Sequence, residues 1–88
     1  MSYEIVIPRR AQRSLARLRP TDRKEVRDAI FALSDDPRPH GVRTLKGKRG
    51  EYLRLRVGHY GLIYQVQEEI LTVLVARLGH RREAYRNI

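Results

Sequence analysis

The stretch from Tyr52 to Tyr64 constrains the fold more than any other part of the sequence. Its first half alternates apolar with polar or aromatic side chains, in the two-residue period of a half-buried β-strand. Gly58-His59 then supplies a two-residue connection with glycine at the first central position, as a type II′ turn requires. A β-hairpin is therefore predicted, with Val57 facing Tyr60 across the turn.

This register gives the hairpin two chemically different faces. The first face is apolar and belongs to a hydrophobic core, and it carries Leu53, Leu55, Val57, Tyr60, Leu62 and Tyr64. The second face carries Arg54 and Arg56, with Gly61 directly across from Arg56. The remaining chain must cover the first face and leave the second accessible.

The first half of the chain predicts one strand and two helices. Tyr3–Ile7 is rich in β-formers and reads as a short strand. Apolar residues then recur at helical spacing over residues 8–19 and again over residues 20–36, which predicts two helices packed as an antiparallel hairpin. Asp22 and Glu25 have the spacing of a capping box at the start of the second helix.

The second half predicts a loop, the hairpin and a last strand. Residues 37–50 are punctuated by proline and glycine, and Thr44-Leu45 is either a short strand or an anchor for the loop. Ile70–Leu78 is apolar on both faces, which is typical of a central strand, and Gly79 ends it. Residues 80–86 form a polar tail. The predicted order is β-α-α-β-β-β, a single α+β domain over residues 1–88 with a largely antiparallel sheet and a helical hairpin on one face.

Composition narrows the class of protein. The 88 residues contain no cysteine, which excludes disulfides and thiolate metal sites. The N-terminus lacks the features of a signal peptide, and the longest apolar run, residues 70–76, is too short to span a bilayer. We therefore expect a cytoplasmic protein that does not bind membranes.

The net charge of +9, from 19 basic and 10 acidic residues, points to an anionic partner. Arginine supplies most of the positive charge and suits bidentate contacts with phosphate. Nucleic acid is the partner that this charge favours. An ordinary solvated surface or an acidic protein partner are the alternatives.

Basic and aromatic residues from three segments are candidates for an RNA site. We expect the catalytic residues to be Arg54, Arg56, His80, Arg81 and Tyr85, and the RNA-binding residues to be Lys46, Lys48, Arg49 and Arg82. RNA carries its own nucleophile, the 2′-hydroxyl, so cleavage needs alignment, charge stabilisation and proton transfer. Because arginine stays protonated, His80 and Tyr85 are the titratable candidates for proton transfer.

Structural roles compete with each of these assignments. His80 could be a solvated surface residue, and Tyr85 could dock the tail on the core. Arg54 and Arg56 could pair with acidic side chains, for which the candidates are Glu51, Glu68 and Glu69. The three histidines lack ligand spacing, so neither a metal nor any other cofactor is expected.

Three motifs resemble the RelE/ParE toxin superfamily, and its RelE branch most. They are Leu-Lys-Gly at 45–47, Tyr-Leu-Arg-Leu-Arg-Val-Gly-His-Tyr-Gly-Leu-Ile-Tyr at 52–64, and Arg-Leu-Gly-His-Arg-Arg-Glu-Ala-Tyr-Arg at 77–86. The resemblance implies a toxin of a type II toxin–antitoxin system. It implies metal-independent cleavage of mRNA in the ribosomal A site, and inhibition by a cognate antitoxin in a hetero-oligomer.

The resemblance also assigns roles to individual residues. Arg54 and Arg56 match basic strand positions that hold and activate the scissile phosphate. Arg81 matches an arginine that stabilises the transition state or protonates the leaving oxygen, and Tyr85 a tyrosine that stacks on the nucleotide. The assisting positions are those of Lys46 and His80.

Two residues depart from the family's pattern. Gly61 stands where family members commonly carry arginine, and Tyr52 where one well-known type carries lysine, so the general base is not identified. A ParE-like inhibitor of DNA gyrase and an RNA-binding module with little catalysis are the alternative functions.

Overall fold

The computed structural model describes residues 2–80. Within them the elements follow one another as β1 (Glu4–Val6), α1 (Arg9–Ala16), α2 (Pro20–Ala32), β2 (Arg43–Gly47), β3 (Gly50–Val57), β4 (Tyr60–Gln67), the 3-10 turn η1 (Glu68–Ile70) and β5 (Thr72–His80). The predicted α+β class is confirmed, and the observed order contains one strand more than the predicted β-α-α-β-β-β, because β2 is a full strand where a short strand or a loop anchor was expected.

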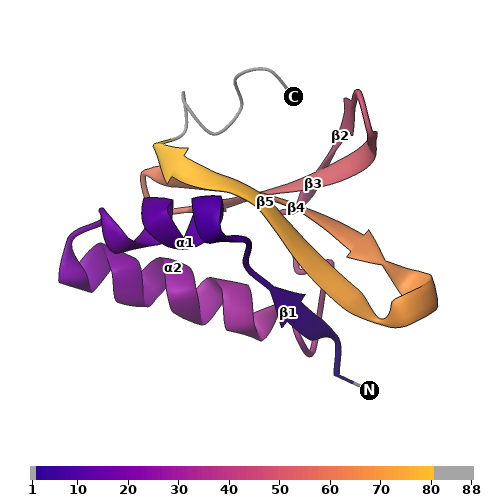
Figure 1. Cartoon of the computed structure of the whole chain (residues 1–88), viewed down its shortest axis with the longest axis horizontal. Coiled ribbons are helices and arrows are strands. Elements are labelled where there is room, and N and C mark those ends of the chain that lie inside the picture. Colours follow the sequence, from indigo (N-terminus) through magenta and orange to yellow (C-terminus); the bar gives the residue numbers. More distant parts are fainter. Residues whose placement is uncertain (1, 81–88) are drawn as a thin grey trace.

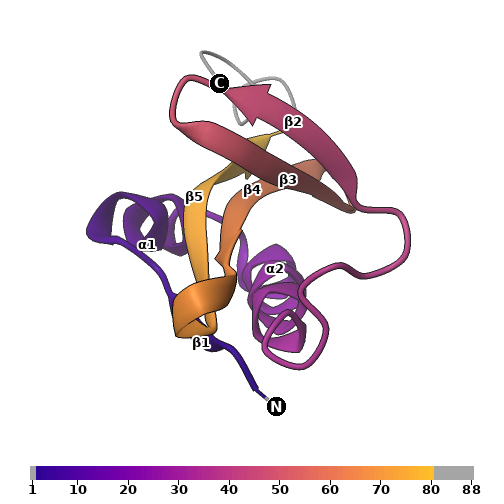
Figure 2. The same cartoon turned by 90° about the vertical axis from the view of Figure 1, so that its right-hand side faces the viewer.

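The five strands form one sheet in the order β1-β5-β4-β3-β2. β1 pairs with β5 in parallel and every other neighbouring pair is antiparallel. Both helices lie on the same side of this sheet (Figure 1), as the helical hairpin predicts. Figure 2 shows β2 at the top of the molecule, away from both helices.

The central hairpin has the register that its sequence predicts. Val57 pairs with Tyr60, Arg56 with Gly61, and Leu53 with Tyr64. Because side chains alternate between the two faces of a strand, this register settles the direction of every residue in β3 and β4.

A second hairpin precedes it. Lys48-Arg49 forms a two-residue turn between Gly47 and Gly50, which pair with each other across β2 and β3. Gly50 has a φ of 109°, a backbone conformation that favours glycine. The glycines that suggested a loop therefore mark a tight turn between two strands.

The predicted capping box of α2 is wrong. Arg19 is the N-cap, and no side chain bonds the first turn as a cap. Pro20 occupies the first helical position, where its fixed φ suits a helix and its missing N–H costs nothing. This places Asp22 inside the first turn, where its carboxylate accepts a hydrogen bond from the Tyr60 hydroxyl at 2.9 Å instead.

α1 ends at Ala16, earlier than the predicted boundary near Arg19. The Arg23 guanidinium, on α2, donates to the carbonyl oxygens of Leu18 at 3.0 Å and Ala16 at 3.3 Å. These bonds satisfy carbonyls that a helix leaves without partners at its C-terminus, so the two helices are joined by a short, firmly bonded turn.

β5 is central in the sheet, as predicted, but its limits differ from the predicted Ile70–Leu78. η1 delays its start to Thr72, since Leu71 takes a left-handed conformation with a φ of 45°. The strand continues through Gly79 to His80, because pairing with β4 extends to Tyr60. Ala76 has no partner between the pairs Ile63–Arg77 and Tyr64–Val75, which makes a β-bulge in β5.

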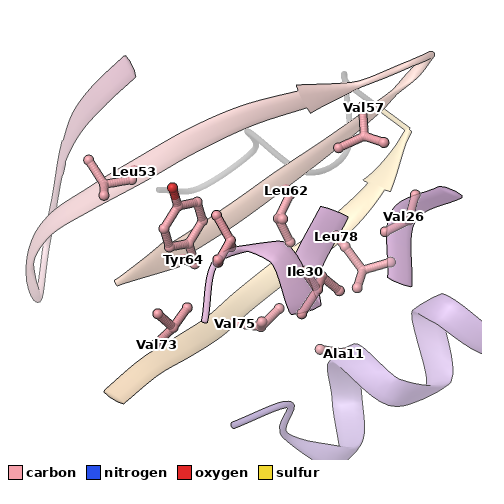
Figure 3. Packing of buried hydrophobic residues seen from close by; sticks show 11 residues of the cluster. Ala11, Val26, Ile30, Leu53, Val57, Leu62, Tyr64, Val73, Val75 and Leu78 are labelled. Atoms are coloured by element: carbon pink, nitrogen blue, oxygen red, sulfur yellow. The ribbon is translucent and has the colours of Figure 1, made fainter. Parts of the chain in front are cut away.

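The core lies between the helices and the sheet (Figure 3). Its buried residues are Ala11, Val26, Ile30, Leu33, Leu53, Val57, Leu62, Tyr64, Val73, Val75 and Leu78. From the predicted apolar face of the hairpin, Leu55 and Tyr60 pack at its margin and are half-buried. The Tyr64 hydroxyl donates to the Pro37 carbonyl oxygen at 2.7 Å, which ties the loop before β2 to the centre of the sheet.

Candidate nucleic-acid interface

Within residues 2–80, four arginines stand on the face of the sheet that the helices leave open. In the strand register, Arg54 is opposite Arg43 on β2 and opposite Ile63 on β4. Ile63 in turn is opposite Arg77 on β5. Arg56 lies two residues beyond Arg54 on β3 and therefore shares its face. We call Arg43, Arg54, Arg56 and Arg77 the arginine face.

A shallow depression of about 260 Å³ lies on this face. Among the described residues it is lined by Gly41, Arg43, Arg54 and Arg56. Gly41, with a φ of 91°, turns the chain sharply just before β2. Val42 then packs against the core, so Arg43, the next residue in the extended chain, points to the opposite face.

The four side chains of the arginine face differ in their exposure to solvent and in their interaction partners. Arg43 and Arg56 are exposed and form no ion pair within residues 2–80. Arg54 and Arg77 are half-buried and have partners, so Arg54 is less exposed than the open platform predicted for it. They flank Ile63, which is fully buried although it lies on the face away from the helices. Aliphatic arginine stems cover apolar surface well while their charged ends stay in water.

Two of the acidic side chains considered as partners for Arg54 and Arg56, Glu51 and Glu68, lie elsewhere. Glu51 is the strand partner of Lys46 and directly precedes Tyr52 on β3. Because successive side chains of a strand alternate between faces, Glu51 lies on the opposite face from Tyr52 and Arg54. Glu68 contacts Arg38 at 2.6 Å and accepts a hydrogen bond from the Tyr3 hydroxyl at 2.7 Å. These two hydrogen bonds, from Tyr3 first and Arg38 second, lower the pKa of Glu68. Glu68 thus joins the N-terminal strand, the loop after α2 and the β4–β5 turn.

The structure separates His80 from the arginines that it was expected to assist. His80 pairs with Tyr60, whose ring packs at the margin of the core, so both lie on the helix side of the sheet. Their ring centroids are 5.9 Å apart with an interplanar angle of 69°, an edge-to-face contact. His80 therefore lies on the opposite face of the sheet from Arg54 and Arg56.

The predicted RNA-binding residues of the first hairpin are also spread out. Lys48 and Arg49 are exposed at its turn, beyond the depression. Lys46 is exposed on β2 but on the opposite face from Arg43, as its pairing with Glu51 requires. The remaining predicted residues, Arg81, Arg82 and Tyr85, lie outside the described residues.

The arginine face contains two residues that the sequence did not single out, Arg43 and Arg77. Arg43 was obscured by the proline and glycine residues around it. Arg77 was obscured by the bulge, since strict alternation from Val73 and Val75 would turn its side chain into the core. Tyr52 also lies on this face, since it stands two residues before Arg54 on β3.

The arrangement is suited to holding a phosphate group. Guanidinium groups donate several hydrogen bonds in fixed directions and keep their charge at any physiological pH. Charge fixed in this way stabilises negative charge that develops in a transition state. The described residues contain no group of three His, Cys, Asp or Glu side chains placed to hold a metal ion, and no helix within them is long and apolar enough to cross a membrane.

Comparisons with known proteins agree with this architecture. Residues 5–85 match the family model described as the ParE toxin of the type II toxin–antitoxin system parDE. The RelE1 protein of Methanocaldococcus jannaschii is 27% identical over 99% of both chains. A chain in the toxin–antitoxin complex RelBE2 of Mycobacterium tuberculosis superimposes with a TM-score of 0.79 at 28% identity, covering 92% of this chain and 100% of that one. A variant of toxin RelE from E. coli in the free state has a TM-score of 0.71 at 26% identity, covering 99% and 94%.

Proposed function

This chain belongs to the RelE/ParE superfamily of type II toxins, and we propose that within it the protein acts as a RelE-type endoribonuclease that cleaves mRNA on the ribosome. The observation that carries this proposal is the arginine face with its depression beside Arg54 and Arg56. A cluster of guanidinium groups on a rigid sheet suits a scissile phosphate, and the relatives of known structure include RelE itself.

In the proposed reaction the RNA supplies the nucleophile. The 2′-hydroxyl loses its proton as its oxygen attacks the adjacent phosphorus, and a pentacoordinate phosphate forms. The bond to the 5′-oxygen then breaks, which leaves a 2′,3′-cyclic phosphate and, after the 5′-oxygen takes up a proton, a 5′-hydroxyl. Arg54 and Arg56 stabilise the charge on the phosphate oxygens. Arg43 binds the RNA backbone at the edge of the depression, and the matching tail residues Arg81 and Tyr85 complete the site as their family counterparts do.

Among the described residues the arginine face carries few groups that can transfer protons, with Tyr52 sharing this face, and this favours dependence on the ribosome. An aligned substrate brings the 2′-oxygen and phosphorus into the reactive geometry, and alignment alone can supply a large part of a rate enhancement. We therefore expect efficient cleavage within translated coding sequence and poor cleavage of free RNA.

Primer extension on mRNA from cells that express the protein tests this proposal. The wild type should give cleavage ends within coding sequence, and Arg56→Ala should reduce them by roughly 10²–10³, the range for losing a donor to a transition-state oxyanion. Arg13→Ala is the matched control, because Arg13 is exposed on α1 on the other side of the sheet and should leave cleavage unchanged.

Inhibition of DNA gyrase is the second candidate, because the matching family model is described by the name ParE. Relaxed plasmid DNA in cells whose mRNA stays intact would support it and contradict the nuclease proposal. Intact mRNA with normal supercoiling would leave a basic RNA-binding module as the remaining function.

We also infer that a cognate antitoxin binds this chain. A neighbour of similar sequence was solved as a toxin–antitoxin complex, and the net charge of +9 favours an acidic binding segment. A small DNA-binding protein with an acidic tail, encoded next to this gene, would be the expected partner. Association of the two proteins in a hetero-oligomer is tested by co-expression and copurification.

A further inference from the structure

Three side chains join the first turn of α2 to the last residue of β5 on the helix side of the sheet. The Tyr60 hydroxyl donates to the Asp22 carboxylate at 2.9 Å, and the edge-to-face contact links the Tyr60 ring to His80. Asp22 is the third residue of α2, and His80 is the end of the paired part of β5. We call Asp22, Tyr60 and His80 the clamp.

The surroundings of the clamp hold Tyr60 in one place. Its hydroxyl bond to Asp22 is partly buried, and this bond, followed by desolvation, raises the pKa of Tyr60. One turn further along α2, the Glu25 carboxylate lies 3.1 Å from where a Cβ at Gly58 would be, so α2 also abuts the β3–β4 turn. A tyrosine fixed at both its ring and its hydroxyl is a rigid surface for a second ring.

We propose that His80 is a positioning residue, which uses its ring contact with Tyr60 to fix the end of β5 from which Arg81 and Tyr85 follow in the sequence. This inference rests on the proposed nuclease function, in which those two tail residues complete the site. His80 is exposed, and its ring contacts that of its strand partner Tyr60. This contact therefore holds the last residue of β5 against β4. The role differs from proton transfer, for which His80 lies on the wrong face.

Two substitutions of His80 separate positioning from proton transfer. His80→Phe keeps an aromatic ring against Tyr60 and removes the titratable group, whereas His80→Ala removes both. As a positioning residue, His80→Phe should cleave within about threefold of wild type with the same pH profile, since an aromatic pair retains most of the contact. His80→Ala should lose roughly 10- to 100-fold, because small displacements of catalytic groups have effects of that size.

Tyr60 provides the other half of the test. Tyr60→Leu removes both the ring contact with His80 and the hydrogen bond to Asp22, so it should lose at least as much activity as His80→Ala, and the double variant should be no worse than Tyr60→Leu. Equal losses in His80→Phe and His80→Ala, of about 10²–10⁴ with an altered pH profile, would make His80 a proton-transfer group and overturn the proposal. Wild-type cleavage by His80→Ala would overturn it as well.

Amide hydrogen exchange at the end of β5 tests the clamp without reference to activity. The amides of residues 78–80 should exchange faster in His80→Ala and Tyr60→Leu and at the wild-type rate in His80→Phe. Unchanged exchange in all three variants would show that the ring contact does not hold the strand. If the wild type left mRNA intact, the nuclease function would fail, and exchange at the end of β5 would still decide the clamp.

Discussion

At the scale of single residues, the direction of a side chain decides its role. Arg43 and Lys46 are both basic, both exposed and only three positions apart on β2, but they lie on opposite faces of the sheet. Arg43 lines the depression with Arg54 and Arg56, whereas Lys46 lies on the other face, opposite its strand partner Glu51. Charge alone does not distinguish these two residues, and strand register does.

This difference predicts unequal effects on RNA binding. Arg43→Ala should weaken binding of a non-cleavable, 2′-deoxy-substituted single-stranded oligonucleotide and lower the slope of log affinity against log salt by about one. Lys46→Ala should change both quantities much less. Titrations at several salt concentrations measure them, and a Lys46→Ala effect as large as that of Arg43→Ala would mean that RNA does not follow the arginine face.

Gly61 gives a second prediction at this scale. Gly61 is directly across from Arg56, as predicted. It is buried, however, whereas the sequence predicted that it would be exposed on the open face of the sheet. On its other side it faces Gly79, where an added Cβ would meet nothing within 4 Å.

We expect Gly61→Arg to raise cleavage, because it adds a guanidinium beside Arg56. A donor at a developing oxyanion is worth about 10²–10³ in rate, and the gain here should be smaller since neighbouring arginines already supply charge. Gly61→Gln, a neutral side chain, is the control and should give no gain. Lower cleavage by a folded Gly61→Arg protein would mean that the glycine admits the RNA or another backbone closely.

At the scale of elements, buried hydroxyl groups connect strands to loops. Tyr64, in β4, bonds the carbonyl of Pro37 and so fixes the segment that leads through Gly41 to Arg43. Burial raises the pKa of Tyr64 from 10.0 to about 12. Because the unfolded chain loses this proton first, the stability that Tyr64 contributes is fully present below pH 10 and is lost as the pH rises toward about 12.

Tyr64→Phe should therefore lower the free energy of unfolding at neutral pH by about 1 kcal/mol, the net value of a typical hydrogen bond. The difference between the two proteins should shrink from about pH 10 upward. Urea denaturation at a series of pH values measures it. A difference that stayed constant to about pH 12 would contradict the assigned ionisation of Tyr64.

Elements with a clear period were predictable from the sequence, and irregular positions were not. The β3–β4 register followed from alternation and a two-residue turn, and it correctly placed Arg54 opposite the core. The bulge at Ala76 reverses the phase of β5, so no count along the sequence assigns Arg77 to the arginine face. The face on which His80 lies could not be predicted for a related reason, since it depends on pairing with Tyr60 beyond the predicted end of the strand.

At the scale of the whole molecule, positive charge should govern association with the antitoxin. A net charge of +9 attracts an acidic partner over a distance that salt shortens, from about 30 Å at 0.01 M to about 8 Å at 0.15 M. The association rate should therefore fall steeply with ionic strength, whereas the dissociation rate should change little. Stopped-flow measurements over this range test it, and a constant association rate would exclude electrostatic steering.

The pairing of β1 with β5 sets the time at which a newly made molecule can fold. Glu4–Val6 has its strand partner in Thr72–Leu74, near the other end of the sequence, and Val73 and Val75 belong to the core. A nascent chain that lacks β5 has no partner for its first strand and an open gap where the centre of the sheet should be. Such long-range pairing cannot form until the late strand has been made. For a toxin, this delay means that a copy can fold only after its late central strand, β5, has been made.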